Sequence, residues 1–296
     1  MKILITGAAG FVGRRLAARL AAEGHEVVAL VRGTPDGELG RWLSHGAISV
    51  LRQDLATLDF GCLPSGIEAV CTLAQSSRFR DFPGSAEETF DVNVTSNLRL
   101  LQWAVRSGVK RVVHASSGGI YGANRRAPLQ ESDLLALDSP LGFYLGTKLC
   151  SEIVLQNYRQ FLETTVILRP FFIYGPGQRA DMFMPRIIQS VRSGRPLQLQ
   201  GRDGLRTNPV YVDDAASAFA SALRLVGTHV INVAGPDVLS LREMGERIGR
   251  ETGAAPRFEQ VDGEPADYVA DTSQAQAKLG LRLTPFEAGL HATVHA

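Results

Sequence analysis

Three polar side chains in the middle of the chain have the types and spacing that proton transfer needs. Tyr144 and Lys148 lie four residues apart at the start of a segment that we predict to be helical, and residues at this spacing share one face of a helix. An ammonium group beside a phenol favours the phenolate, so we expect Lys148 to lower the pKa of Tyr144 from its ordinary value of about 10. Such a tyrosine can give or take a proton near neutral pH.

Ser117 adds a hydroxyl group to this pair. It follows the apolar segment 111–116, which we predict to be a strand, and ligands of open α/β sheets bind beyond the carboxyl ends of the strands. A serine there can hold a substrate oxygen while the tyrosine moves its proton. A tyrosine and a lysine at this spacing also occur by chance on helix surfaces, so the interpretation depends on the rest of the chain.

Short apolar segments alternate with helical patterns along the first 234 residues. The predicted strands are 2–6, 26–32, 48–52, 69–74, 111–116, 165–170 and 229–234. Continuous apolar strands separated by helices indicate a parallel sheet covered on both faces. We therefore predict an α/β fold, a Rossmann-type doubly wound parallel sheet with a smaller C-terminal substrate lobe.

The domain organisation follows from where this alternation loosens. We expect residues 1–170 to form a dinucleotide-binding domain, which the chain rejoins at about residues 210–235. Residues 171–209 and 236–296 then form the substrate-binding lobe. Asp213 and Asp214 are expected to cap a helix.

The first strand leads into a glycine-rich turn, Gly7-Ala8-Ala9-Gly10-Phe11-Val12-Gly13. Glycine is needed where the chain turns tightly, where backbone approaches phosphate, and where a helix packs close to a strand. The N-terminus of the next helix offers free N–H groups and a positive dipole end to a pyrophosphate. Strand, glycines and helix together predict dinucleotide binding.

The end of the second strand indicates which dinucleotide to expect. An acid normally lies at the end of this strand, about twenty residues past the glycines, where it accepts from the ribose hydroxyls of NAD. In this chain no acid occurs between Glu26, at the start of the strand, and Asp36. Arg32 lies there instead, and its planar guanidinium can pair with a 2′-phosphate. We therefore expect NADP, with NAD as the alternative. Asp54, after the third strand, either accepts from the adenine amino group or caps a loop or helix.

The composition excludes several classes of protein. The 31 basic and 30 acidic residues give a net charge of +1, so no nucleic-acid partner is expected. Three cysteines without a C-x-x-C pair favour a reducing cytoplasm. No apolar run reaches the roughly 18 residues of a membrane span. The six histidines are scattered, and we expect no metal site.

Together these motifs resemble the extended short-chain dehydrogenase/reductases, the NAD(P)-dependent nucleotide-sugar epimerase/dehydratase family. The matching pieces occur in order along nearly the whole length, which is more specific than any one of them. They lie at 7–13, 54–55, 73–74, 93–94, 116–122, 144–148, 168–177, 211–214 and 271–280.

The resemblance implies hydride transfer between a sugar carbon, usually C4, and the nicotinamide. Ser117 would be catalytic, Tyr144 the acid and base, and Lys148 the residue that holds the nicotinamide ribose and tunes Tyr144. Asn93 would organise the cofactor side rather than react. The expected cofactor-binding residues are Gly7, Gly10, Phe11, Val12, Gly13, Arg32, Asp54, Leu55, Leu73, Ala74, Asn93, Tyr144 and Lys148. The expected substrate-binding residues are Arg78, Ser117 and Arg206.

Three departures from the family pattern narrow the choice of reaction and substrate. Many 4,6-dehydratases carry an Asp-Glu pair where this chain has Gly118-Gly119, which argues against dehydration. Thr207 occupies the place of the arginine that contacts the substrate diphosphate, and Arg206 lies one residue earlier. Arg32 in place of the acid is more usual in reductases that use NADPH than in epimerases.

Our leading hypothesis is an NADPH-dependent reductase of a nucleotide-linked 4-keto-sugar. The alternative is a nucleotide-sugar 4-epimerase with retained NAD(P). Because Thr207 occupies the place of the diphosphate-binding arginine, a third hypothesis is a reductase or dehydrogenase of a non-nucleotide ketone or alcohol. A non-catalytic cofactor-binding protein is an alternative of another class. A homodimer is expected through the helix at 93–107 and the one following Tyr144, although both could simply cover the sheet.

Two sets of residues keep two interpretations each. Arg169 either lies against the nicotinamide side or pairs with an acid such as Glu152. The run Arg78-Phe79-Arg80 either lines the substrate mouth or forms a surface loop.

Overall fold

A computed structural model describes residues 1–296 except for 34–39, 42–43, 45, 47, 123–127 and 137–140. Its centre is a seven-stranded parallel sheet in the order β3-β2-β1-β4-β5-β6-β9. The strands are β1 (Lys2–Thr6), β2 (Glu26–Val31), β3 (Ile48–Arg52), β4 (Ala69–Thr72), β5 (Arg111–Ala115), β6 (Thr164–Pro170) and β9 (Gly227–Val233). Every predicted strand is present with ends that differ by at most two residues, and the predicted Rossmann-type fold is confirmed.

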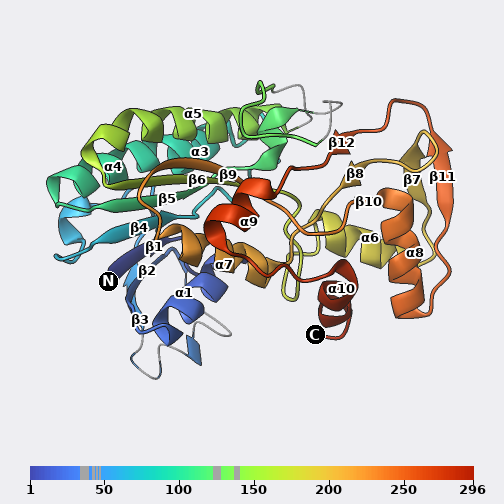
Figure 1. The fold of residues 1–296 in the computed structure, drawn as a ribbon, viewed down its shortest axis with the longest axis horizontal. Coiled ribbons are helices and arrows are strands. Elements are labelled where there is room, and N and C mark those ends of the chain that lie inside the picture. Colours follow the sequence, from blue (N-terminus) through green and yellow to red (C-terminus); the bar gives the residue numbers. More distant parts are fainter. Residues whose placement is uncertain (34–39, 42–43, 45, 47, 123–127, 137–140) are drawn as a thin grey trace.

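Helices cover both faces of this sheet (Figure 1). One layer comprises α1 (Gly13–Ala22), α7 (Val212–Ala222) and α9 (Ser273–Leu279). The other comprises α3 (Ala86–Phe90), α4 (Ser96–Arg106) and α5 (Gly142–Tyr158). Strand β1 shows why both layers are needed, because Ile3 and Ile5 are buried in the first core and Leu4 in the second.

Local sequence explains where several of these elements begin and end. Gly24 adopts a φ of 82°, a conformation that ends α1 at little steric cost. The predicted helix at 93–107 starts earlier than expected, because a π-helical turn, η2 (Asp91–Thr95), joins α3 to α4. Three 3₁₀ turns are described as well, η1 (Phe60–Cys62), η3 (Gly118–Tyr121) and η4 (Arg159–Phe161).

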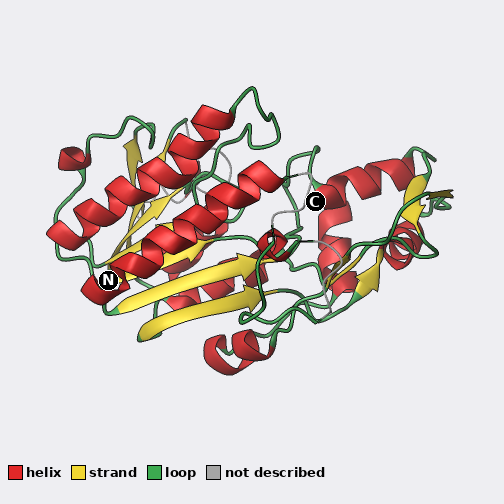
Figure 2. Cartoon of the chain, turned by 90° about the horizontal axis from the view of Figure 1, so that it is seen from above, coloured by secondary structure: helices red, strands yellow, loops and turns green. Residues whose placement is uncertain are grey.

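A smaller group of elements lies beyond the sheet (Figures 1 and 2). Its helices are α6 (Phe183–Arg192), α8 (Leu241–Thr252) and α10 (Phe286–Val294). Its short strands are β7 (Leu197–Gln200), β8 (Arg206–Thr207), β10 (Leu239–Ser240), β11 (Phe258–Val261) and β12 (Asp267–Tyr268). Strand β11 pairs with β7, and β8 pairs with both β10 and β12. These elements share a core of their own, which includes Met184, Leu197 and Phe286.

The chain passes between the two groups more than once. Strand β9 lies beside β6 in the large sheet, and Ala275 and Leu279 of α9 are buried beneath the same sheet. Helix α9 therefore packs on the sheet, although it falls in the range 236–296 that we assigned to the smaller lobe. The exact lobe boundaries stay a prediction.

Asp213 and Asp214 do not cap α7, contrary to expectation. Tyr211 is at the N-cap position, and the two acids lie in the first turn of the helix. Asp213 is 3.4 Å from Arg15 of α1, and Asp214 accepts hydrogen bonds from the backbone N–H and the hydroxyl of Thr284. Their role is to connect α7 with α1 and with the C-terminal segment.

A buried ion pair joins the end of β6 to the middle of α5. Arg169 donates from Nε and Nη2 to the two carboxylate oxygens of Glu152, at 3.0 and 2.7 Å. Its Nη1 donates to the Tyr121 hydroxyl at 2.7 Å, and that hydroxyl donates to Asn232 Oδ1 at 2.8 Å. Arg169 is 4% and Glu152 1% exposed. Of the two interpretations of Arg169, the structure shows the pairing with Glu152.

Helices long and apolar enough to cross a bilayer do not occur in the described part of the chain.

Loss of this ion pair should destabilise the fold strongly. Removing one partner of a buried pair leaves an uncompensated charge, so Arg169→Ala should lower the free energy of unfolding by about 3–5 kcal/mol. Arg202→Ala is the control, because the Arg202 side chain is 91% exposed, and it should change stability by less than about 0.5 kcal/mol. Urea denaturation of both variants measures the difference, and equal stabilities would contradict the structural role of the pair.

Candidate active site

The sheet brings Ser117 and the Tyr144 turn of α5 together. Ser117 follows β5 and caps η3, where its Oγ accepts from the backbone N–H of Gly119 at 3.2 Å. Gly119 in turn faces Leu145, since a Cβ added to it would lie 2.8 Å from a Leu145 methyl group. The strand-end serine and the tyrosine therefore lie on two segments in direct contact at the carboxyl edge of the sheet.

Lys148 is buried one turn further along the same helix. Its Nζ donates to the carbonyl oxygen of Ala115, the last residue of β5, at 3.0 Å, and lies 5.8 Å from the centre of the Tyr144 ring. Burial lowers the pKa of Lys148 to about 8, and the carboxylate of Glu152 opposes this effect. The lysine consequently ties α5 to the end of β5.

Tyr144 is also buried, with 9% of its surface exposed. Its hydroxyl donates to Gln75 Oε1 at 2.9 Å, and its ring packs on Phe79 with 4.6 Å between ring centres. Burial raises the pKa of Tyr144, and Arg80 lowers it by a smaller amount. The predicted lowering of this pKa by Lys148 is wrong for this arrangement, because loss of hydration outweighs the nearby positive charge.

The loop after β4 covers the tyrosine. Arg80 lies over the Phe79 ring at 4.8 Å and pairs with Asp181 at 3.2 Å. Arg179 pairs with the same aspartate at 2.7 Å and donates to the carbonyl oxygen of Ser77 at 3.1 Å. These contacts fasten the loop to the segment that leads into α6, so the two sides of the site are joined by charge.

Two residues of this loop, Gln75 and Arg78, have contacts that we did not predict from the sequence. Gln75 was not predicted as a site residue, although its position just beyond β4 is a usual place for ligand contacts. Arg78 was predicted to bind substrate, and the structure places it between Asp81, at 2.6 Å, and Glu88, at 3.6 Å. Contact between Arg78 and a substrate stays a prediction.

The glycine turn has the shape that a diphosphate requires. Gly7 adopts a φ of 69°, and a Cβ there would lie 2.8 Å from the backbone nitrogen of Ala74. A Cβ on Gly13 would collide with the carbonyl oxygen of Gly7. Helix α1 begins without a side-chain cap and without an acid in its first turn. These residues fit a dinucleotide, because backbone donors at this end of α1 are left for an anion.

The other predicted cofactor residues occupy several positions around this turn. Phe11 and Val12 complete the turn, and Leu73 follows β4 beside Ala74. Arg32 is exposed at the end of β2, with Nη2 3.5 Å from Ser77 Oγ. None of these placements by itself tests a contact with the cofactor.

Asn93 and Asp54 have structural partners. Asn93 accepts from the backbone N–H of Ser76 at 3.1 Å and donates to Thr147 Oγ1 at 2.8 Å. It thereby joins the loop after β4 to α5. Asp54 accepts from the backbone N–H of Ala56 at 3.0 Å, as a loop cap does. Leu55 is buried in the core under α4.

The residues of β8 lie in the smaller lobe. Arg206 has a half-exposed side chain 3.6 Å from Asp267. Thr207 is fully buried, and its hydroxyl has no hydrogen-bond partner among the described residues. Thr207 therefore cannot make the diphosphate contact of the arginine whose place it occupies. A phosphate contact by Arg206 stays a prediction.

The turn after Ser117 has no room for a side chain at its first glycine. A Cβ on Gly118 would collide with the aromatic ring of Phe171, which is buried. An acid at this position would require the ring to move. The glycine pair thus reflects packing as well as the absence of acid chemistry.

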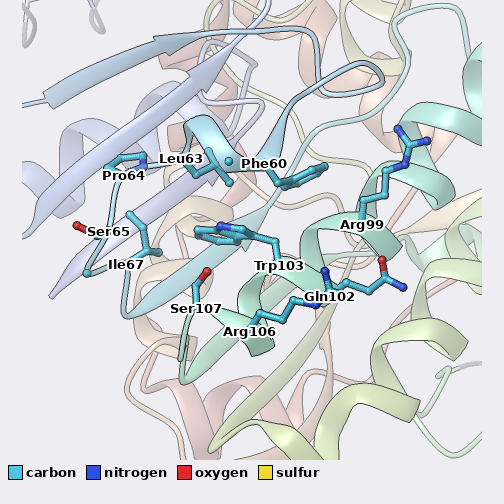
Figure 3. Close-up of a pocket in the computed structure, with 12 residues that line it drawn as sticks. Phe60, Leu63, Pro64, Ser65, Ile67, Arg99, Gln102, Trp103, Arg106 and Ser107 are labelled. Atoms are coloured by element: carbon cyan, nitrogen blue, oxygen red, sulfur yellow. The ribbon is translucent and has the colours of Figure 1, made fainter.

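A pocket of about 590 Å³ lies at the opposite edge of the sheet (Figure 3). Trp103 of α4 faces the segment 60–67 there, and Arg99 and Arg106 of the same helix also line the pocket. This segment precedes β4, whereas Ser117 follows β5. The pocket is therefore separate from the site around Tyr144.

The chain belongs to the NAD dependent epimerase/dehydratase family, which it matches over residues 3–234. The resemblance to the extended short-chain dehydrogenase/reductases is confirmed, and the protein is an enzyme of this type.

Similar proteins of this family include two 4-epimerases of UDP-glucuronate. The probable UDP-glucuronate 4-epimerase of Rhizobium meliloti is 30% identical over 72% of this chain and 65% of its own length. The UDP-glucuronate 4-epimerase of Thermodesulfobacterium geofontis is 29% identical over 99% of this chain and 94% of its own length. Among solved structures, MoeE5 in complex with UDP-glucuronic acid and NAD is 30% identical, with a TM-score of 0.85 over 99% of this chain and 98% of MoeE5.

The buried lysine gives a prediction for pH dependence. The pKa of Lys148 falls from 10.5 to about 8 on folding, so between these values the unfolded chain binds a proton that the folded chain has lost. Stability rises with pH wherever the unfolded state binds more protons. The stability of the wild type relative to Lys148→Met should therefore increase from about pH 8 to about pH 10.5.

Urea denaturation at several pH values measures this difference. Lys110→Met is the matched control, because the Lys110 side chain is 58% exposed, and its stability difference from the wild type should stay flat. A flat difference for Lys148→Met as well would show that this ammonium is not desolvated.

Proposed function

We propose that the protein is an NAD-dependent 4-epimerase of a UDP-linked sugar, with UDP-glucuronate as the first substrate to test. The observation that carries the proposal is the contact between the Ser117 turn and the α5 turn bearing Tyr144, next to a glycine turn that fits a diphosphate. The curated relatives named above are 4-epimerases, and the solved neighbour binds a UDP-sugar with NAD.

This proposal replaces the reductase that we expected from Arg32. The comparisons favour the epimerase alternative and do not support NADP as the main cofactor. Arg32 by itself does not decide between the two cofactors, because its guanidinium is exposed and its contact with the Ser77 hydroxyl is 3.5 Å long. We propose NAD, and the experiment below keeps NADP as its other outcome.

The turn at Gly118 favours epimerisation or reduction over dehydration. Elimination of water needs a further acid and base beside the reacting carbon. Phe171 fills the space in which an acid at position 118 would begin. Within the family, the chemistry therefore depends on the serine, the tyrosine and the lysine.

When bound, NAD would supply the redox part of the reaction, as acceptor and then donor of the hydride at C4 of the sugar. The phenol oxygen of Tyr144 would take the proton of the sugar 4-hydroxyl and return it once the sugar has presented its other face. For this, the Tyr144 hydroxyl must break its hydrogen bond to Gln75 and form one with the sugar 4-oxygen. Ser117 would donate to the same oxygen as charge develops there.

Lys148 would support this proton transfer in two ways. It anchors α5 to Ala115, which fixes the position of Tyr144 relative to Ser117. As an ammonium group 5.8 Å from the phenol ring it also favours the phenolate once substrate and cofactor hydrogen bonds replace the present ones.

Loss of the phenol should abolish most of the activity. Tyr144→Phe should lower kcat for C4 inversion of UDP-glucuronate by about 10²–10⁴-fold, and Ser117→Ala by about 10²-fold. Tyr158→Phe is the matched control, since Tyr158 lies at the far end of the same helix against Phe161. Product is measured by ion-exchange chromatography with no cofactor, NAD or NADP added.

The dependence on cofactor separates the epimerase hypothesis from the reductase hypothesis. An epimerase forms product with NAD without net consumption, whereas a reductase consumes NADPH in step with a 4-keto-sugar. Stoichiometric NADPH oxidation, or full activity of Tyr144→Phe, would contradict the proposal.

We also propose that the chain forms a homodimer through α4 and α5. These helices cover one face of the sheet and carry exposed apolar side chains on their outer surface, at Leu98 and Ile153. Phe161, just beyond α5, is 58% exposed and extends this surface.

Charge on this surface should separate the subunits. A Leu98→Asp/Ile153→Asp variant should elute as a monomer in size-exclusion chromatography with light scattering, whereas the wild type elutes as a dimer. Val226→Asp is the control, because Val226 is an exposed apolar residue outside both helices. A dimer that survives the double substitution would place the interface elsewhere.

A further inference from the structure

Two histidines and a glutamate meet on the outer surface of the smaller lobe. His291 lies on α10, and His295 follows directly after this helix. His291 Nδ1 is 2.7 Å and His295 Nε2 is 2.8 Å from the same oxygen, Oε1 of Glu251 in the last turn of α8. One ligand atom of each residue lies within 4.8 Å of the other two.

The cluster gives a reason to propose a metal site where the sequence led us to expect none. His291 and the C-cap residue His295 are four residues apart, the spacing of one helix face, and their ring centres are 4.6 Å apart. The third ligand comes from forty residues earlier in the chain. Folding alone brings that carboxylate to the pair.

The backbone beneath the cluster is held rigidly. Phe286 and Leu290 of α10 are buried in one core with Ile248 of α8. One turn before the cluster, Arg247 and Glu287 form an ion pair between the same two helices. The helices therefore hold the Cα positions of Glu251 and His291, and His295 directly follows α10. Both imidazole rings are exposed.

We propose that Glu251, His291 and His295 bind a divalent transition-metal ion, Zn²⁺ being the best match. Imidazole nitrogen and carboxylate oxygen are preferred ligands of Zn²⁺, at about 2.0–2.2 Å, and three protein ligands plus water complete its four-coordinate shell. Mg²⁺ and Ca²⁺ prefer all-oxygen sites and should bind poorly.

The three side chains converge on one point, so a single ion can contact one atom of each. A cation between the rings and the carboxylate takes the place of the hydrogen bonds that now connect them. The ion would then fasten α10 to α8, and with it the C-terminal segment to the smaller lobe.

The test uses the full chain without an affinity tag, stripped with a chelator and then dialysed. Addition of ZnCl₂ should raise the melting temperature, because a ligand that binds only the folded state stabilises it, and MgCl₂ should not. The rise should be lost in His291→Ala and in His295→Ala. His229→Ala is the control, since His229 is half-buried on β9, away from the cluster, and bonds to the carbonyl oxygen of Val226.

Cobalt substitution makes the test independent of stability. A Co²⁺ titration should give one equivalent of visible absorption bands without the charge-transfer band of a thiolate ligand, which excludes the exposed Cys62. These bands should disappear in the His291→Ala/His295→Ala double variant. Absence of the bands in the wild type, or bands and a Zn²⁺ shift that persist in the double variant, would overturn the proposal.

Discussion

The buried pair of Arg169 and Glu152 holds α5, the helix that carries Tyr144 and Lys148, to the sheet. Glu152 lies one turn beyond Lys148 on α5, and Arg169 lies near the end of β6, where the chain leaves for the smaller lobe. Tyr121 and Asn232 extend the same network to η3 and β9. One set of hydrogen bonds thus fixes the relative positions of the strand ends, of α5, and of the Ser117 turn.

Burial dominates the electrostatics around this network. It raises the pKa of Tyr144 and lowers those of Lys148 and His114, the last to about 3. His114 is therefore neutral at pH 7, and its Nδ1 lies 2.7 Å from Thr72 Oγ1. A dry site strengthens each hydrogen bond within it, but it also penalises charge until a ligand supplies compensating contacts. The proton transfer that we propose for Tyr144 would accordingly depend on substrate binding.

Charged and apolar contacts together join the two lobes. Phe172, just after β6, packs on Phe183 of α6 and on Tyr268 of β12. Arg80 and Arg179 share Asp181, and these contacts hold the loop that covers Tyr144 against the start of the smaller lobe. Exposed ion pairs contribute little stability, and Met182 adds an apolar contact to the cluster of Phe79 and Tyr144.

Much of the fold and part of the site could be predicted from the sequence, because these features are encoded locally. Strand ends follow from short apolar runs, the diphosphate turn follows from Gly7 and Gly13, and Tyr144 and Lys148 share a helix face because of their spacing. Those signals need no knowledge of distant residues.

Other features depend on contacts between residues far apart in sequence. The direction of the Tyr144 pKa shift is set by how deeply Phe79 and the sheet bury the phenol, which spacing along a helix does not reveal. The partners of Tyr144 and of His291, Gln75 and Glu251, come from separate elements. Sequence alone thus determined which chemical groups are available and in what order. The tertiary structure decided which of them meet and how much water they lose, because burial and proximity exist only once the chain is folded.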